Sequence, residues 1–585
     1  MVNVDFCLSC ADTSARIEPT QVSTSRTRFG LRTERIGPLP LLNHFIERLG
    51  ISALFDRHVP TDRRHALSHA QALLVLLRSI LIEREPIYRQ QETVHGFAAS
   101  LFGLDSDQAV QIGDDRLGRA LDALFFADRA ALLTELIVMV GKVFAVDFAE
   151  LHNDSTSIRF CGQYRSSSSE FQGRRSPAIV YGYSKDHRPD LKQLLFILTT
   201  SADGGVPVQF RTADGNTSDS ITHIDTWETL KKIAGRADFL YVADSKLCSF
   251  DNLDHIHRAG GRFVTVLPRT RFEDREFRRA IQTEAIPWEK VWDRPHPRNG
   301  SGPRDRWYTY RHPLPSAEVW PVTWVWSTLL TLKQHARRQH RLAAALERLS
   351  ALKERLARPR ARRRAAAQLD PQVAQILERY RVVRYLKVER VVREMHTFKQ
   401  IRRGRPGPDT QYKKLTRQRY DLQWALDQDA IAYDEKSDGM YPLLCNDRSL
   451  SPEAVLTAHK GQPTLEKRFE QTKTVHQIAP VFLKSPARVE ALFTLYFMVL
   501  LVQALIEREL RRAMRREKID SLPLYPETRP CKRPTTELIL RLFSLAERHT
   551  LTREARVVQI FDPELNTLQR QVLELLGVDP RSFCV

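Results

Sequence analysis

The stretch LKQLLFILTTSADGGVPVQFRTADGN, residues 191–216, decides the fold. It holds two apolar runs separated by a Gly-Gly pair, a pattern that predicts two strands joined by a tight hairpin. A helical pattern follows at 221–235, and the apolar run 239–243 then predicts a buried strand. A further helix leads to another apolar strand at 261–267. This alternation predicts a mixed α/β sheet with helices on its faces.

The pattern changes on both sides of this core. The residues before it show helical periodicity, with Ser68 placed to cap a helix, and the apolar run 491–506 after it is shorter than a bilayer span, so we expect a buried core helix. The predicted organisation is a flexible tail (1–34), a helical N-terminal domain (35–147), the first part of the core (148–267), an insertion with Trp-rich, basic helical and strand segments (268–447), the second part of the core (448–514) and a helical C-terminal region (515–585).

The charge of the chain is strongly positive and unevenly placed. The 585 residues carry a formal charge of +20, and residues 331–403 alone hold 21 Lys and Arg against 6 Asp and Glu. Such a concentration favours a polyanionic partner, with nucleic acid ahead of an anionic membrane surface. The cysteines form only one C-x-x-C pair, Cys7 and Cys10, which indicates free thiols in a reducing cytoplasm. No secretory signal is evident, and no membrane partner is expected.

Two aspartates end predicted strands. Asp154 closes the strand in DFAELHND, and Asp244 closes the strand at 239–243. Carboxylates at the carboxyl ends of neighbouring strands converge on one edge of an α/β sheet. Two such oxygen ligands suit Mg²⁺ or Mn²⁺, and a third carboxylate on a docked helix would allow two ions. An aspartate at a strand end is, however, more often a turn or cap residue, so each one alone is weak evidence.

Five short motifs carry a resemblance to a known family. They are HNDST (152–156), GYSKDHRPD (182–190), GNTSD (215–219), VADSK (242–246) and LEKRFEQTK (465–473). In this order they resemble the landmarks of insertion-sequence DDE transposases, in the branch of the IS-four superfamily with a long N-terminal helical region. The resemblance covers roughly residues 35–575. It implies an RNase H-like catalytic core interrupted by an insertion before the last catalytic helix.

The resemblance also implies the catalytic residues. Asp154 and Asp244 match the two catalytic aspartates, and Glu466 matches the glutamate, with all three as ligands of two Mg²⁺ or Mn²⁺ ions. Lys473 follows Glu466 by seven residues, as the lysine of the family's Tyr-Arg-Glu-Lys signature does, which selects Glu466 over Glu470. The tyrosine and arginine positions of that signature depart from the family, because they hold His459 and Gln462.

Several basic residues are candidates for DNA phosphate contact: Lys185, Arg188, Lys246, Arg468 and Lys473. Asn216 and Asp219 are expected to cap the following helix rather than to act in catalysis. Relatives of this family stack an aromatic residue of the insertion on a flipped base, so the insertion's tryptophans are candidates for that role: Trp288, Trp292, Trp307, Trp320, Trp324 and Trp326.

The resulting hypothesis is a cut-and-paste transposase in the bacterial cytoplasm, acting on nucleoid DNA. It would bind the terminal inverted repeats of its element, hydrolyse the phosphodiester at each end and join the 3′-hydroxyls to target DNA. Bringing two ends together requires a homodimer or larger assembly on DNA, with the leucine stripe at 342–356 as one candidate contact. The alternatives are an RNase H-like nuclease without strand transfer and an inactive, transposon-derived DNA-binding protein.

Overall fold

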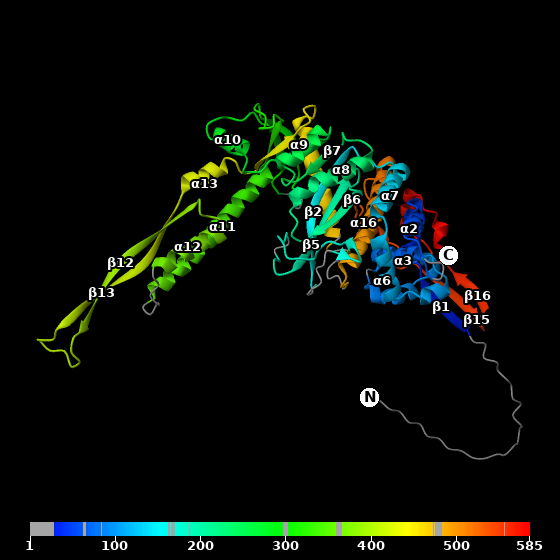
Figure 1. The fold of residues 1–585 in the computed structure, drawn as a ribbon, viewed down its shortest axis with the longest axis horizontal. Helices are drawn as coiled ribbons and strands as arrows, with labels where there is room; N and C mark the ends of the chain where they lie inside the picture. The colour runs from blue at the N-terminus through cyan, green and yellow to red at the C-terminus, as the bar shows by residue number, and fades with distance from the viewer. Residues whose placement is uncertain are drawn as a thin grey trace, which may run out of the picture.

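The computed structural model describes residues 29–61, 66–83, 85–161, 164, 170–185, 188–296, 302–358, 366–471, 473, 483–554 and 556–584. Cys7 and Cys10 lie outside the described residues. The molecule has a body, in which helices pack against a large sheet, and a long arm that projects from the body on the side away from the N-terminal helices (Figure 1). The fold is therefore mixed α/β, with helical regions around the sheet.

One nine-stranded sheet runs through the body in the order β6-β5-β2-β7-β8-β14-β11-β10-β9. Strand β5 pairs antiparallel with both β6 and β2, whereas β2, β7 and β8 are parallel to one another. The strands are β2 (Glu150–Phe160), β5 (Lys192–Ser201), β6 (Pro207–Asp214), β7 (Leu240–Ala243), β8 (Arg262–Val266), β9 (Glu289–Arg294), β10 (Asp305–Arg311), β11 (Val322–Ser327) and β14 (Met440–Cys445).

The turn between β5 and β6 requires its glycines. Gly204 and Gly205 have φ angles of 86° and 63°, in the left-handed region that residues with a Cβ rarely adopt. The apolar residues of β5 are buried throughout, because helices cover the sheet. The parallel strands need crossover connections, which helices α8 (His223–Ala234) and α9 (Phe250–Arg258) supply.

Four strands of the insertion extend the sheet, and two others, within the arm, form a separate two-stranded sheet. Strand β14 pairs with β8, and β11, β10 and β9 follow outward as antiparallel neighbours. Helix α10 (Phe272–Ala280) packs on this extension, where Phe277 stacks on Trp324 with 3.6 Å between the ring centroids. The tryptophans of these strands thus form the core of the extension.

Helices surround a long central helix, α16 (Pro486–Arg516), which packs against α1, α3, α6 and α18 as well as β6. It is long and apolar enough to cross a membrane, but 89% of its apolar stretch is buried inside the protein. Ser68 and Gln71 form a capping box at the start of α3. The helices of this layer are α1 (Leu39–Arg48), α2 (Ile51–His58), α3 (His69–Ile82), α4 (Gln90–His95), α5 (Ser106–Val110), α6 (Asp114–Phe126), α7 (Arg129–Phe144), α17 (Thr536–Arg541) and α18 (Thr567–Leu576).

Two predicted boundaries need correction. The sequence predicts a tail over 1–34, but β1 (Phe29–Arg35) pairs with β15 (Glu547–Arg553), and β15 pairs with β16 (Arg556–Phe561). The C-terminal region predicted to be helical therefore also supplies two strands. The strands of this small sheet are largely exposed, so they lack the apolar alternation that marks a half-buried strand, and β1 finds its partner more than 500 residues away.

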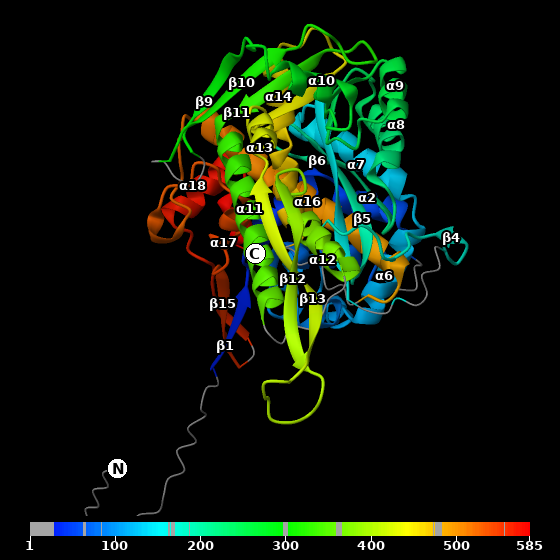
Figure 2. The ribbon, with the colours of Figure 1, turned by 90° about the vertical axis from the view of Figure 1, so that its left-hand side faces the viewer.

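The arm consists of two helices packed on a two-stranded ribbon (Figures 1 and 2). The ribbon pairs β12 (Leu386–Gln400) with β13 (Tyr412–Leu426), and α13 (Gln428–Glu435) returns the chain to the body. Helix α11 (Thr328–Ala357) buries Leu342, Leu349 and Leu352 against α12 (Ala366–Arg379) and the ribbon. The leucine stripe expected to form a dimer contact is therefore buried by packing within the same chain.

Candidate functional site

Asp154 and Asp244 lie side by side on neighbouring parallel strands. Asn153 of β2 is paired with Ala243 of β7, so each aspartate is the next residue along its own strand. The sequence predicts that Asp154 closes its strand. This prediction is wrong, because β2 continues to Phe160 through its pairing with β5. The pairing of β2 with β7 ends one residue before Asp154, at the pair of Asn153 with Ala243.

Lys185 and Asp219 complete the cluster. The ammonium of Lys185 lies 2.9 Å from Oδ2 of Asp219 and 3.8 Å from Oδ1 of Asp154. The same ammonium donates to the carbonyl and the hydroxyl of Ser155, each at 2.7 Å. One cation therefore faces a group of carboxylates from three different segments of the chain.

Burial has the largest effect on the ionisation of this cluster. Burial raises the pKa of Asp154 to about 6, against the attraction of Lys185, and the neighbouring Asp244 and Asp219 add to the rise. Burial also raises the pKa of Asp244, although the backbone amide of Lys246 and the charge of Lys185 oppose it. Two carboxyl groups with raised pKa values beside one lysine form a site that an additional cation would stabilise.

Asp219 is a site residue that the sequence pattern does not reveal. It was expected to cap a helix with Asn216, but the cap position of the 3-10 helix η3 (Asp219–Thr222) is Ser218, and the structure gives the Asp219 carboxylate to Lys185. Asn216 is exposed. The motif GNTSD marks the segment, but only the tertiary contact with Lys185 distinguishes a site carboxylate from a cap.

A buried pair supports the cluster from behind. Nδ1 of His223, at the start of α8, lies 3.0 Å from the hydroxyl of Tyr241 on β7. Burial lowers the pKa of His223 to about 4, so the imidazole is neutral at physiological pH. Burial likewise raises the pKa of Tyr241, and the nearby Asp244 adds to that rise. This neutral pair fixes the end of β7 without bringing further charge to the aspartates.

Helix α15 (Pro463–Glu470), which carries Glu466, packs against β2 and β5. Gln462, one turn before Glu466, donates to the carbonyl of Asn153 at 3.4 Å, which places the start of α15 beside the residue that precedes Asp154. Glu466 itself is exposed. Within the described ranges, no three His, Cys, Asp or Glu side chains are grouped to hold a metal ion. The structure thus brings Asp154 and Asp244 together and docks the helix of Glu466 nearby, without joining Glu466 to their cluster.

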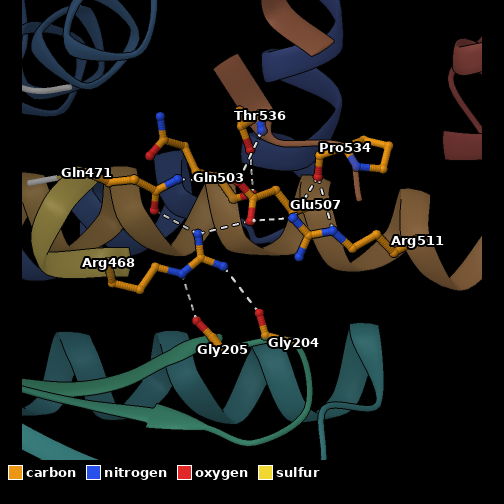
Figure 3. A network of polar contacts seen from close by, with 9 residues as sticks. All are labelled: Gly204, Gly205, Arg468, Gln471, Gln503, Glu507, Arg511, Pro534 and Thr536. Atoms are coloured by element: carbon orange, nitrogen blue, oxygen red, sulfur yellow. Dashed lines mark hydrogen bonds and ion pairs between the residues drawn. The ribbon is translucent and has the colours of Figure 1, made fainter. Parts of the chain in front are cut away.

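Arg468 is not a DNA-binding residue, contrary to the expectation from sequence. Its guanidinium is buried between α15, α16 and the β5–β6 turn (Figure 3). It donates to the carbonyls of Gly205 and Gly204 at 3.0 and 3.2 Å, and it pairs with Glu507 at 3.1 Å. The charge of Arg468 therefore anchors α15 to the body.

The other basic candidates occupy different positions. Lys246 is exposed next to Asp244, and Lys473 is half-buried just beyond α15. Arg188 is exposed and forms a two-point ion pair with Asp190. Lys185 is committed to the carboxylate cluster.

The unusual residues before Glu466 are also internal. His459, in α14 (Pro452–Gly461), is largely buried near His152, and burial lowers its pKa to about 3. A neutral imidazole at this position brings no positive charge to a phosphate. All six tryptophans named as candidates for base stacking are buried or half-buried, which favours a structural role for them.

The aspartate cluster fits a divalent cation. Mg²⁺ is held in proteins by one or two carboxylates together with water and substrate phosphate oxygens. Asp154 and Asp244 supply two hard oxygen donors from adjacent strands, and burial raises the pKa of both carboxyl groups. The donor set contains no sulfur or imidazole ligand, which suits Mg²⁺ or Mn²⁺ better than Zn²⁺.

Comparison with known proteins adds little to this picture. Residues 31–138 match a family described as a domain of unknown function, DUF4277. No curated protein matches the chain. Among solved structures, the cryo-EM structure of the piggyBac transposase synaptic complex with hairpin DNA is similar at 10% identity and a TM-score of 0.25, over 49% of this chain and 60% of that chain. A TM-score this low does not define a shared fold.

Proposed function

We propose that this chain is a DNA transposase of the DDE type, built on an RNase H-like core. The observation that carries the proposal is the pair Asp154 and Asp244, placed next to each other on parallel strands of a mixed sheet beside Lys185. The order of the five motifs along the chain, which resembles insertion-sequence transposases, supports the same reading.

Asp154 and Asp244 would hold Mg²⁺ or Mn²⁺, with Glu466 as the third ligand that the family resemblance implies. The metal would activate the attacking oxygen and stabilise the negative charge of the leaving oxygen. We propose two Mg²⁺ or Mn²⁺ ions in each active site. For Glu466 to join the aspartates, α15 would have to shift or its exposed side chain would have to turn toward them.

The protein's own residues would position the DNA. Lys185 stands where a phosphate oxygen would approach the aspartates, so its ammonium would orient the scissile phosphate. Lys246 is exposed beside Asp244, and its ammonium would contact a DNA phosphate next to the scissile one. The neutral His223–Tyr241 pair would hold β7 rigid, because phosphoryl transfer depends on positioning more than on covalent chemistry.

The proposed reaction is cut-and-paste transposition. The chain would bind the terminal inverted repeats of its own element, hydrolyse the phosphodiester at each end and direct the 3′-hydroxyls into target DNA. Two ends must be held together, so a homodimer or larger assembly would form on double-stranded DNA. The reaction would take place in the bacterial cytoplasm on nucleoid DNA.

Two other functions are compatible with these residues. An RNase H-like nuclease without strand transfer would use the same aspartates. An inactive, transposon-derived DNA-binding protein is favoured by one observation, the replacement of the family's cationic grip by the buried His459 and by Gln462. The presence of both aspartates and of Glu466 favours an active enzyme.

The test uses the full chain with Mg²⁺ and a labelled duplex that carries the inverted repeat flanking its gene. We expect cleavage by the wild type and none by Asp154→Asn or Asp244→Asn. Asp238→Asn is the matched control, because Asp238 lies just before β7 but is exposed, and its carboxylate pairs with Arg236. Cleavage that survives either site substitution would contradict the metal-site assignment, and cleavage without joining would favour the nuclease.

A further inference from the structure

The far end of the arm is a separate feature from the aspartate cluster. Helix α11 ends at Ala357, where Arg419 of β13 donates to the carbonyls of Ala357 and Arg358. Beyond this contact the ribbon continues alone, and Figures 1 and 2 show its end projecting past the helices. We refer to residues 395–418 as the tip segment. Most of its side chains are exposed to solvent.

The tip segment is strongly cationic. It contains seven basic residues and one acidic residue, Asp409. All seven basic side chains are exposed, and no carboxylate of the described residues forms an ion pair with them. They are Lys399, Arg402, Arg403, Arg405, Lys413, Lys414 and Arg417. Seven unpaired cations on an isolated ribbon repel a second copy of the same ribbon and attract a polyanion.

The tip segment also exposes apolar side chains. Phe398 is 67% exposed, Ile401 60%, Tyr412 49% and Met395 43%. An aromatic and apolar surface among unpaired cations is costly in water unless a partner covers it. Apolar side chains beside arginines are typical of proteins that insert into the grooves of DNA.

The loop at the end of the ribbon has the shape for a narrow groove. Gly404 lies between Arg403 and Arg405, has a φ of 156° and has no atom within 4 Å of where a Cβ would stand. A glycine there lets the backbone come close to the floor of a groove while the two arginines reach along it. The minor groove of A·T-rich DNA is narrow and strongly negative, which favours inserted arginine over lysine.

We propose that the tip segment binds double-stranded DNA in the minor groove at A·T-rich sequence, with Arg403 and Arg405 inserted on either side of Gly404. The lysines at 399, 413 and 414 contact the flanking phosphates. The arm places this contact away from Asp154 and Asp244, so the tip segment binds a part of the DNA that is distant from the phosphate that reacts. The proposal rests on the proposed function in one respect, since it names a second contact with the same DNA partner.

The test measures binding in EDTA, so that a failure of cleavage cannot affect it. Fluorescence anisotropy of the full chain follows two labelled 30-base-pair duplexes, one with a central A·T tract and one with G·C. We expect the wild type to prefer the A·T duplex by roughly 10-fold, and netropsin, a minor-groove ligand, to remove that preference. Arg403→Ala/Arg405→Ala should bind the A·T duplex roughly 10-fold more weakly.

The charge-preserving variant Arg403→Lys/Arg405→Lys separates groove insertion from phosphate attraction. We expect it to keep wild-type affinity for the G·C duplex and the wild-type salt dependence, and to lose the A·T preference. Lys232→Ala, an exposed substitution on α8, should change nothing. Equal binding of both duplexes by the wild type overturns the proposal, as does an alanine variant that binds like the wild type. Tip-dependent binding to phosphatidylserine vesicles in place of DNA overturns it as well.

Discussion

Arg468→Met tests whether one buried ion pair holds the helix of Glu466 in place. The side chains of Arg468 and Glu507 are 3% and 4% exposed, and Arg468 also donates to two carbonyls of the β5–β6 turn. Glu507 further pairs with Arg511 at 3.3 Å and accepts from the Thr536 amide at 3.0 Å (Figure 3). Removing one partner of a buried pair costs roughly 3–5 kcal/mol, because the other charge stays buried.

That cost should appear locally in α15. A loss of about 3 kcal/mol raises the equilibrium for local opening roughly 100-fold, so amide hydrogen exchange in α15 should accelerate by about that factor. Mass spectrometry of the intact chain resolves this segment. Arg516→Met is the control, because Arg516 lies on the same helix as Glu507 but its side chain is 69% exposed, and we expect its effect to be near zero. Exchange in α15 that changes less than about threefold in Arg468→Met would refute the anchoring argument.

The same network predicts a dependence on pH. Burial opposes ionisation of Glu507, but Arg468, Arg511 and the Thr536 amide outweigh it and lower its pKa below the ordinary 4.5. A carboxyl group with a lowered folded-state pKa stabilises the fold above its unfolded value and loses that contribution as the pH falls through the lowered value. Protection of α15 should therefore hold at neutral pH and fall below about pH 4.5, and Glu507→Gln should remove this acid step.

Three further outcomes are expected. Glu466→Gln should lower cleavage of the labelled end about 1,000-fold while Glu470→Gln retains it, measured on denaturing gels; the reverse result would move the catalytic assignment by one helical turn. EDTA should abolish cleavage, and added Mg²⁺ should restore it in the wild type but not in Asp244→Asn. His223 stays neutral in the folded protein down to about pH 4, whereas the unfolded chain protonates it near 6.5. The melting temperature should therefore fall as the pH drops through this window, and His223→Leu should flatten the slope.

The local pattern of the chain predicts much of the central sheet. The hairpin of β5 and β6, the strands β7 and β8 and the helices between them follow from apolar runs, a Gly-Gly turn and helical periodicity. These features depend on neighbours within about ten residues, so the sequence alone is sufficient to indicate them. Both aspartates stand at the end of a strand-like segment of the sequence, although β2 continues past Asp154 to Phe160.

Other features depend on contacts between distant segments. Lys185 and Asp219 meet only when the sheet is assembled, so the pattern of each segment suggested a DNA contact for one and a helix cap for the other. Arg468 looked like a surface cation on a charged helix, but Glu507, 39 residues further along, makes it an internal anchor. Strand β1 has little apolar pattern of its own and exists through pairing with β15.

The sequence by itself therefore determined the elements of the α/β core, the positive charge of the arm and the carboxylates available for a metal. Only the tertiary structure decided which charged side chains are exposed to solvent and which are buried in ion pairs within the protein. The physical reason is that secondary structure follows from local periodicity, whereas the role of a charged side chain depends on burial and on the partner that the fold brings to it. For this chain that difference separates Arg468, fixed between two helices, from Arg403 and Arg405, which remain exposed at the end of the arm.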